Sequence, residues 1–175
     1  VGETYEEHAK RILAHSRKES EQAAKRGVRI HNELELFFRK ACIHSADMGD
    51  YETDIRKICD ATKSVLDVNC GEQGWISEKS FCHKELGYGG KIDLYSKEWV
   101  IDFKTKDSIE DKKQLAFDSM AHQLVGYSRG LNGESRRMAN VFISADNPGH
   151  VIFHEWPQDK HELYWNVFTS ALDLW

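Results

Sequence analysis

Two short apolar segments joined by a turn constrain this chain more than any other feature. The first, residues 90–94, contains Asp93, and the second, residues 99–106, contains Asp102 and Lys104. Alternate residues of a β-strand point to the same face, so Asp102 and Lys104 should lie side by side. Because a hairpin brings Asp93 next to them, the pattern predicts two carboxylates and one ammonium group at one edge of a sheet.

Such a group is suited to metal-dependent phosphodiester cleavage. Carboxylates bind a divalent cation, and a lysine beside them orients or activates the attacking water. The triplet alone has little weight, because 30% of the chain is charged and acid-x-lysine triplets arise by chance. The preceding apolar run and the upstream glycine-rich turn with its own aspartate favour a site. On these residues alone, an amphipathic hairpin with solvated charges remains the alternative.

Composition indicates one globular domain with its own core. The chain has 175 residues, 40% of them hydrophobic and 11% aromatic, and only two prolines. These values suit a folded protein rather than a disordered one. No apolar run approaches the roughly 18 residues of a membrane span, so we expect no membrane partner.

The charge balance argues against simple electrostatic clamping of DNA, because the net charge is −5. It does not exclude a nuclease, since metal-binding carboxylates add to the negative count. Local basic clusters matter more for phosphate contacts than the total, although solvated surface is the alternative for each cluster. The clusters are Lys25, Arg26 and Arg29; Lys104 and Lys106; Lys112 and Lys113; and Arg136 and Arg137.

The cysteines form no CxxC pair, which argues against a zinc ribbon. We expect free, buried thiols rather than disulfides. The four cysteines are Cys42, Cys59, Cys70 and Cys82.

Hydrophobic periodicity predicts the order helix, helix, three strands, helix, two strands, helix. This order favours an α/β domain with a mixed sheet. The first helix is expected to bend or break near Gly27. The helices are predicted at 4–42, 53–68, 112–131 and 159–175, and the strands at 75–81, 90–95, 98–105, 138–144 and 151–156.

Four further residues are candidates for the same site. His31 in the first helix is a candidate metal ligand, the alternative being an ordinary helix histidine. Glu78 in the first strand is either a further ligand or an exposed glutamate paired with a lysine. Gln123 and Tyr127 lie four residues apart, so they share a helical face and are candidates for contacting phosphate or base.

In chain order these residues form four motifs: Gly27-x-x-x-His31, Gly90-x-x-Asp93, Asp102-x-Lys104 and Gln123-x-x-x-Tyr127. The set resembles the RecB-type branch of the PD-(D/E)XK nuclease superfamily over roughly residues 25–132. Residues 99–132 resemble mitochondrial genome-maintenance exonucleases and their phage relatives most. The family fold is a restriction-endonuclease-like α/β core, a mixed central sheet flanked by helices in the order αβββαβ, and it matches the predicted order.

The resemblance implies a role for each residue. His31, Asp93, Asp102 and the backbone carbonyl of Phe103 would bind Mg²⁺ or Mn²⁺, with Glu78 a less secure ligand. Asp93, Asp102 and Lys104 would be catalytic, and Lys104 would position the nucleophilic water and stabilise charge on the phosphate. The residues expected to contact or orient the substrate are Gln123, Tyr127, Lys106 and Arg29.

The resulting expectation is one nuclease domain over residues 1–175, with a helical N-terminal part at about 1–70, a catalytic core at about 71–156 and a C-terminal helix at about 159–175. Its activity would be metal-dependent hydrolysis of DNA from single-stranded or frayed ends, in DNA repair, recombination or phage DNA processing. A structure-specific or restriction-type endonuclease and a non-cutting DNA-binding recombination module are the alternatives.

The chain differs from members of this family in two ways. Several relatives carry an iron–sulfur cluster that uses three cysteines after the nuclease motifs, but here no cysteine follows Cys82, so we predict no cluster. The chain is also short, so it would hold DNA through its N-terminal helices, a recombination partner protein or homo-oligomerisation. We expect a cytoplasmic protein of a bacterium or phage-infected cell; a mitochondrial protein is the alternative, although no transit peptide is visible.

Overall fold

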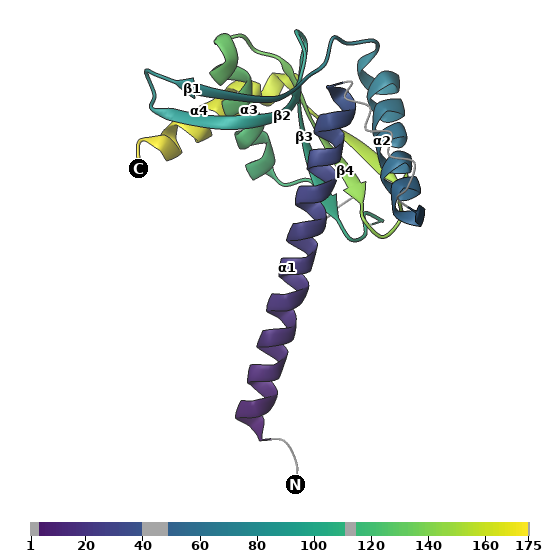
Figure 1. Cartoon of the computed structure of the whole chain (residues 1–175). Coiled ribbons are helices and arrows are strands. Elements are labelled where there is room, and N and C mark those ends of the chain that lie inside the picture. The colour runs from purple at the N-terminus through teal and green to yellow at the C-terminus, as the bar shows by residue number, and fades with distance from the viewer. Residues whose placement is uncertain (1–3, 40–48, 111–114, 175) are drawn as a thin grey trace.

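The computed structural model describes residues 4–39, 49–110 and 115–174. Its elements follow the predicted order of helices and strands (Figure 1). In chain order they are α1 (Tyr5–Phe38), α2 (Gly49–Cys70), β1 (Ile76–His83), β2 (Tyr88–Tyr95), β3 (Trp99–Lys106), α3 (Asp118–Asn132), β4 (Arg137–Ser144), β5 (Val151–Trp156), the short 3₁₀ helix η2 (Gln158–Lys160) and α4 (His161–Leu172).

The five strands form one mixed sheet in the order β1-β2-β3-β4-β5. Strands β3 and β4 are parallel, and every other neighbouring pair is antiparallel. A parallel pair needs a crossover connection, and α3 supplies it between β3 and β4. The prediction of an α/β chain with a mixed sheet is therefore confirmed.

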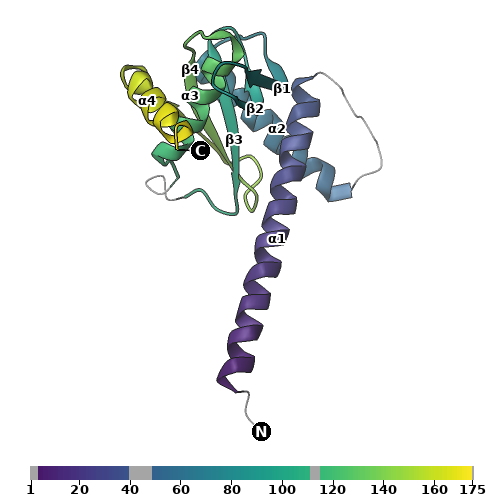
Figure 2. The same ribbon diagram turned by 90° about the vertical axis from the view of Figure 1, so that its left-hand side faces the viewer.

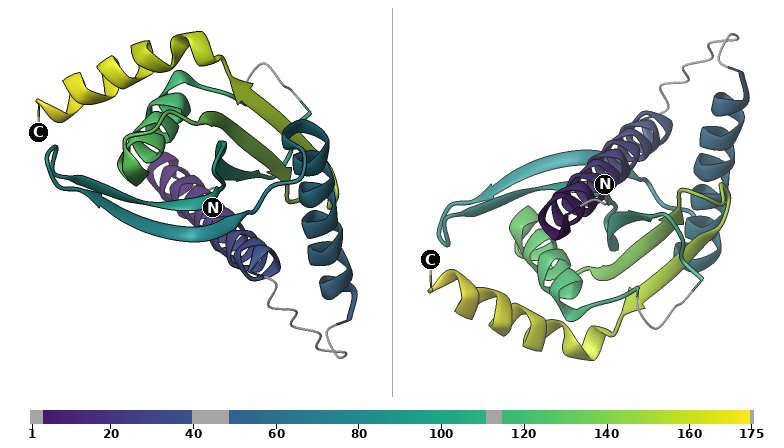
Figure 3. Two further views of the ribbon diagram at one scale, coloured as in Figure 1. Left: turned by 90° about the horizontal axis from the view of Figure 1, so that it is seen from above. Right: turned by 90° about the horizontal axis from the view of Figure 1, so that it is seen from below.

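Helices cover both faces of the sheet (Figure 3). The side chains of β3 are divided between the two faces. Trp99, Ile101 and Phe103 pack in the cluster that contains buried residues of α1 and α2. Val100 packs in the cluster that contains buried residues of α3 and α4. Side chains alternate along a strand, so Asp102, two residues after Val100, is directed to the α3 face.

Helix α1 is long, and only its C-terminal part packs on the sheet. Its 34 residues begin with a capping box between Thr4 and Glu7 and include two buried side chains, Ile30 and Leu34. The N-terminal part extends away from the other elements (Figures 1 and 2). The expected bend or break at Gly27 is wrong, because one glycine weakens a helix by only about 1 kcal/mol and the two buried residues hold its end.

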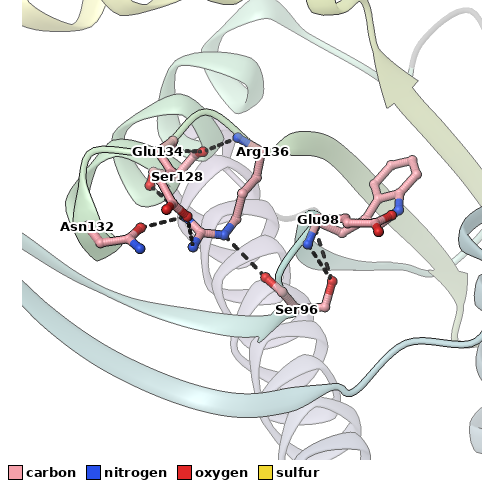
Figure 4. A network of polar contacts seen from close by, with 7 residues as sticks. Ser96, Glu98, Ser128, Asn132, Glu134 and Arg136 are labelled. Atoms are coloured by element: carbon pink, nitrogen blue, oxygen red, sulfur yellow. Dashed lines mark hydrogen bonds and ion pairs between the residues drawn. The ribbon is translucent and has the colours of Figure 1, made fainter.

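A buried arginine connects the end of α3 to the turn between β2 and β3 (Figure 4). The Nε of Arg136 donates to the carbonyl of Ser96 at 3.2 Å. Its Nη1 donates to Oδ1 of Asn132 at 2.9 Å, and its Nη2 to Glu134 at 3.2 Å. The backbone N–H of Arg136 donates to Oγ of Ser128 at 2.9 Å. The network thereby connects the end of α3 to strands β2 and β3.

Several predicted boundaries change. Strands β1 and β2 extend further toward their shared turn than predicted, to His83 and from Tyr88. Helix α3 begins at Asp118, whereas the sequence predicted residue 112, and residues 115–117 are not helical. Lys112, Lys113 and Cys42 lie outside the described residues.

Two further expectations concern thiols and membranes. Cys59 and Cys70 are free and buried, whereas Cys82 is free but exposed. Among the helices that the structure describes, none has both the length and the apolar character needed to cross a bilayer.

Candidate active site

Strand β3 presents Asp102 and Lys104 on the face that α3 covers. The Nζ atom of Lys104 lies 2.8 Å from Oδ2 of Asp102. The side chain of Asp102 is 6% exposed and that of Lys104 is 28% exposed. The carboxylate is therefore buried behind an ammonium group that reaches solvent.

Asp93 joins this pair at the point where the β2–β3 ladder ends. The ladder pairs Tyr95 with Val100 and Leu94 with Ile101. Next along the strand, Oδ2 of Asp93 accepts the backbone N–H of Phe103 at 2.8 Å. A side-chain carboxylate thus bonds a β3 amide between Asp102 and Lys104, and this bond fixes it beside them.

Helix α1 brings His31 to the same place. Its Nδ1 lies 3.5 Å from Oδ2 of Asp93, and its ring meets the ring of Phe103 edge-on with centroids 6.1 Å apart. Ile30 and Leu34 are buried against the sheet on either side of His31 in the sequence, which holds this turn in place. The site therefore contains groups from α1, β2 and β3.

Helix α3 completes the polar contacts of Lys104. The Nζ of Lys104 donates to Oε1 of Gln123 at 3.1 Å, and Nε2 of Gln123 donates to the hydroxyl oxygen of Tyr127 at 2.8 Å. Gly90 makes room for this tyrosine, because a Cβ atom there would lie 2.6 Å from its ring. The predicted pair on one helical face thus lies against the lysine.

Two residues that sequence reasoning missed support Asp102 from behind. Nδ2 of Asn140, on β4, donates to Oδ2 of Asp102 at 2.7 Å. Oδ1 of Asn140 accepts the indole N–H of Trp156, on β5, at 2.8 Å. The sequence feature that could have indicated this role is that Asn140 interrupts the apolar residues between Arg137 and Ser144 in β4.

Burial and neighbouring charges shift the pKa values of two side chains at the site, Asp102 and Tyr127. Burial raises the pKa of Asp102 to about 6 from 3.8; Lys104 opposes this shift, and the nearby Asp93 carboxylate adds to it. Burial also raises the pKa of Tyr127, against the effect of its hydrogen bond from Gln123. Two carboxylates in a buried place with one ammonium group form a site that favours additional positive charge.

The donor set fits Mg²⁺ or Mn²⁺ in its chemistry, since both ions accept carboxylate oxygens and Mn²⁺ also accepts imidazole nitrogen. Within the described residues, however, no three histidine, cysteine, aspartate or glutamate side chains form a ready metal site. Asp102 binds Lys104 instead, and His31 approaches Asp93. Side-chain movement is needed for the three groups to share one ion.

Three predicted site residues are not joined to this group. The carboxylate of Glu78 pairs with Lys91, and its backbone lies in the left-handed region with φ of 56°. Lys106 follows Lys104 on the same face, but its Nζ lies 5.9 Å from the ring centroid of Phe117. Arg29 is exposed and precedes His31 by two residues, which places it on nearly the opposite side of α1.

No protein-family model matches the chain, and no curated protein matches it. A solved structure described as the crystal structure of SSO0001 aligns with a TM-score of 0.36 and 15% sequence identity, covering 81% of this chain and 84% of that one.

Proposed function

We propose that this chain is a metal-dependent deoxyribonuclease with a PD-(D/E)XK-type core that hydrolyses phosphodiester bonds from DNA ends. The observation that carries the proposal is the position of Lys104. Its ammonium group contacts Asp102 and Gln123 at once, while Asp93 accepts the backbone N–H of Phe103, the residue between Asp102 and Lys104, and approaches His31.

The order of elements supports the fold part of the proposal. A helix, three antiparallel strands, a crossover helix and a strand parallel to the third occur in sequence from α2 to β4. The central strand β3 carries both Asp102 and Lys104. This order agrees with the αβββαβ core of the nuclease family whose motifs the sequence resembles.

The charge and position of each side chain at the site suggest its role. His31, Asp93 and Asp102 would hold the divalent cation, which when bound supplies Lewis-acid stabilisation of the phosphate. In hydrolysis, the oxygen of water bonds to phosphorus and one ester bond breaks, leaving a phosphate monoester and a hydroxyl group. Lys104, oriented by Asp102 and Gln123, would position the water and stabilise the negative charge that develops on the phosphate oxygens.

An endonuclease with the same chemistry is the nearest alternative, and a DNA-binding module that does not cut is the alternative from another class. The net charge of −5 motivates the non-cutting module, although an acidic chain also disfavours electrostatic clamping of DNA. Against it stands the cost of keeping Asp102 ionised in a buried place, which a binding module does not require.

Activity on two forms of one substrate separates these functions. An end-labelled single strand and a closed circle of the same sequence are incubated with Mg²⁺, Mn²⁺ or EDTA. Shortening of the linear strand alone, blocked by EDTA, is the expected result. Cutting of the circle would assign the endonuclease instead, and binding without product under any condition would assign the non-cutting module.

A further inference from the structure

A pocket opens beside the candidate active site, between the start of β2, α3 and α4. Its volume is about 380 Å³, within the range of small-molecule sites. Aromatic rings form much of its lining, from Tyr88 on β2, Tyr127 on α3 and Phe168 on α4. Ser119 and Gln123 add two neutral polar groups.

The rings are held in place by close packing against backbone. A Cβ atom at Gly126 would lie 2.9 Å from the ring of Phe168, so this ring sits where only glycine leaves space. The hydroxyl of Tyr88 donates to the carbonyl of Gly126 at 3.0 Å. The rings of Tyr88 and Phe168 meet edge-to-face with centroids 5.0 Å apart. The pocket wall is thereby fixed rather than formed by loose surface side chains.

The chemistry of the lining suits a flat, uncharged ring. None of the residues that line the pocket carries a charged side chain. Aromatic side chains offer stacking surfaces to nucleobases without preference for sequence, and a few neutral polar groups can hydrogen-bond to base edges. A phosphate would instead need the cations that lie outside this pocket.

The pocket is continuous with the catalytic group. Gln123 lines the pocket and also accepts the hydrogen bond from Lys104, and Tyr127 lines it while accepting the hydrogen bond from Gln123. A phosphate at Lys104 therefore places the neighbouring nucleotide beside these two side chains.

We propose that this pocket seats the nucleobase of the nucleotide next to the scissile phosphate, an inference that rests on the proposed nuclease function. Stacking in the pocket would position the strand end for cleavage without reading its sequence. The substrate class is thus a DNA strand whose terminal base is unpaired, because a paired base cannot enter a pocket between β2, α3 and α4.

Single-turnover cleavage of strands that lack one base tests the inference. A set of single-stranded 20-mers carries one abasic site at successive positions from the end. One position, next to the bond that is cut, should slow cleavage by roughly fivefold to a hundredfold, the range for loss of one stacked base. Phe168→Leu should slow cleavage of the intact strand by a similar factor and show no further loss at that position.

Leu163→Ala is the matched control, because Leu163 lies on the same helix and is 59% exposed. It should cleave as the wild type does. Circular dichroism melting shows whether Phe168→Leu is folded, and Tyr88→Phe, which keeps the ring and loses only its hydroxyl, provides a second variant that should retain the abasic penalty. No penalty at any abasic position, or the same penalty in Phe168→Leu as in the wild type, would overturn the inference while leaving the nuclease intact.

A binding measurement separates the inference from the proposed function if no DNA is cut. Strands that carry 2-aminopurine at the end are titrated with protein in EDTA, and stacking quenches the fluorescence. Quenching by the wild type and Leu163→Ala but not by Phe168→Leu would support the base pocket even without cleavage. Equal or absent quenching across the three proteins would overturn it.

Discussion

The amide of Asn140 donates a 2.7 Å hydrogen bond to the Oδ2 atom of Asp102, the same oxygen that lies 2.8 Å from the Lys104 ammonium. Trp156 fixes the amide by donating its indole N–H to Oδ1 of Asn140. The carboxylate therefore has its orientation determined from the core side by β4 and β5 before any ligand arrives.

Asn140→Leu should lower activity by roughly tenfold to a hundredfold, the usual effect of removing a residue that orients a metal ligand. It should also destabilise the fold by about 1–3 kcal/mol, because the indole N–H of Trp156 loses its acceptor. Trp156→Phe removes that N–H together with part of the buried indole, but it leaves the Asn140 amide free to bond Asp102, so it should affect activity less. Steady-state kinetics and chemical denaturation of both variants check this; equal activity in Asn140→Leu and the wild type would contradict it.

Asp102→Asn should stabilise the metal-free protein at neutral pH. The folded-state pKa of Asp102 is about 6, above its ordinary 3.8, so between these values the folded state binds more protons than the unfolded state. Unfolding free energy from this group therefore falls as the pH rises from about 4 to 6. The gain in Asp102→Asn should be on the order of 2 kcal/mol at pH 7.5 and shrink toward pH 4.

Urea denaturation in EDTA across this pH range measures the difference. A variant less stable than the wild type at pH 7.5 by as much as at pH 4 would show that burial does not dominate at Asp102. The same variant should have no nuclease activity, since the amide cannot replace the carboxylate as a ligand.

Gln123→Leu should lower kcat by about tenfold or more and change metal affinity little, because the residue orients Lys104 rather than the cation. Tyr127→Phe loses only the hydroxyl that holds the Gln123 amide, so its effect should be smaller and in the same direction. Metal titration of activity separates the two quantities. A rise in the metal concentration needed, with kcat unchanged, would contradict this role.

Gly90→Ala should destabilise the protein by about 1–3 kcal/mol, because its Cβ would lie 2.6 Å from the ring of Tyr127. Gly74→Ala is the control, since a Cβ there meets no atom within 4 Å and should change stability by less than about 0.5 kcal/mol. Thermal melting compares the two. A Gly90→Ala melting temperature equal to that of Gly74→Ala would mean that the tyrosine moves aside without cost.

The part of the site that local patterns govern was predictable from sequence. Alternation along a strand placed Asp102 and Lys104 on one face, and helical spacing placed Gln123 beside Tyr127. The hairpin turn between β2 and β3 brought Asp93 near. Each of these relationships depends on residues close together in the chain, where periodicity carries the information.

The rest depends on packing between distant segments. Asn140 reaches Asp102 only because β4 lies parallel to β3, and Trp156 reaches Asn140 because β5 pairs with β4. Phe168 reaches the pocket because α4 packs on α3. Glu78 was a candidate ligand because it lies in a predicted strand, but its backbone there is left-handed. No short-range sequence pattern predicts contacts between segments so far apart in the chain.

Lys104 and Asp93 should act in one catalytic group, and single-turnover cleavage of an end-labelled strand with Mn²⁺ is the measurement that decides it. Lys104→Ala and Asp93→Ala should each lose more than about a hundredfold in rate with the fold retained by circular dichroism. Lys63→Ala, which removes an exposed α2 lysine paired with Asp67, should cleave as the wild type does. Cleavage by both site variants at the wild-type rate would show that these residues do not form a catalytic site.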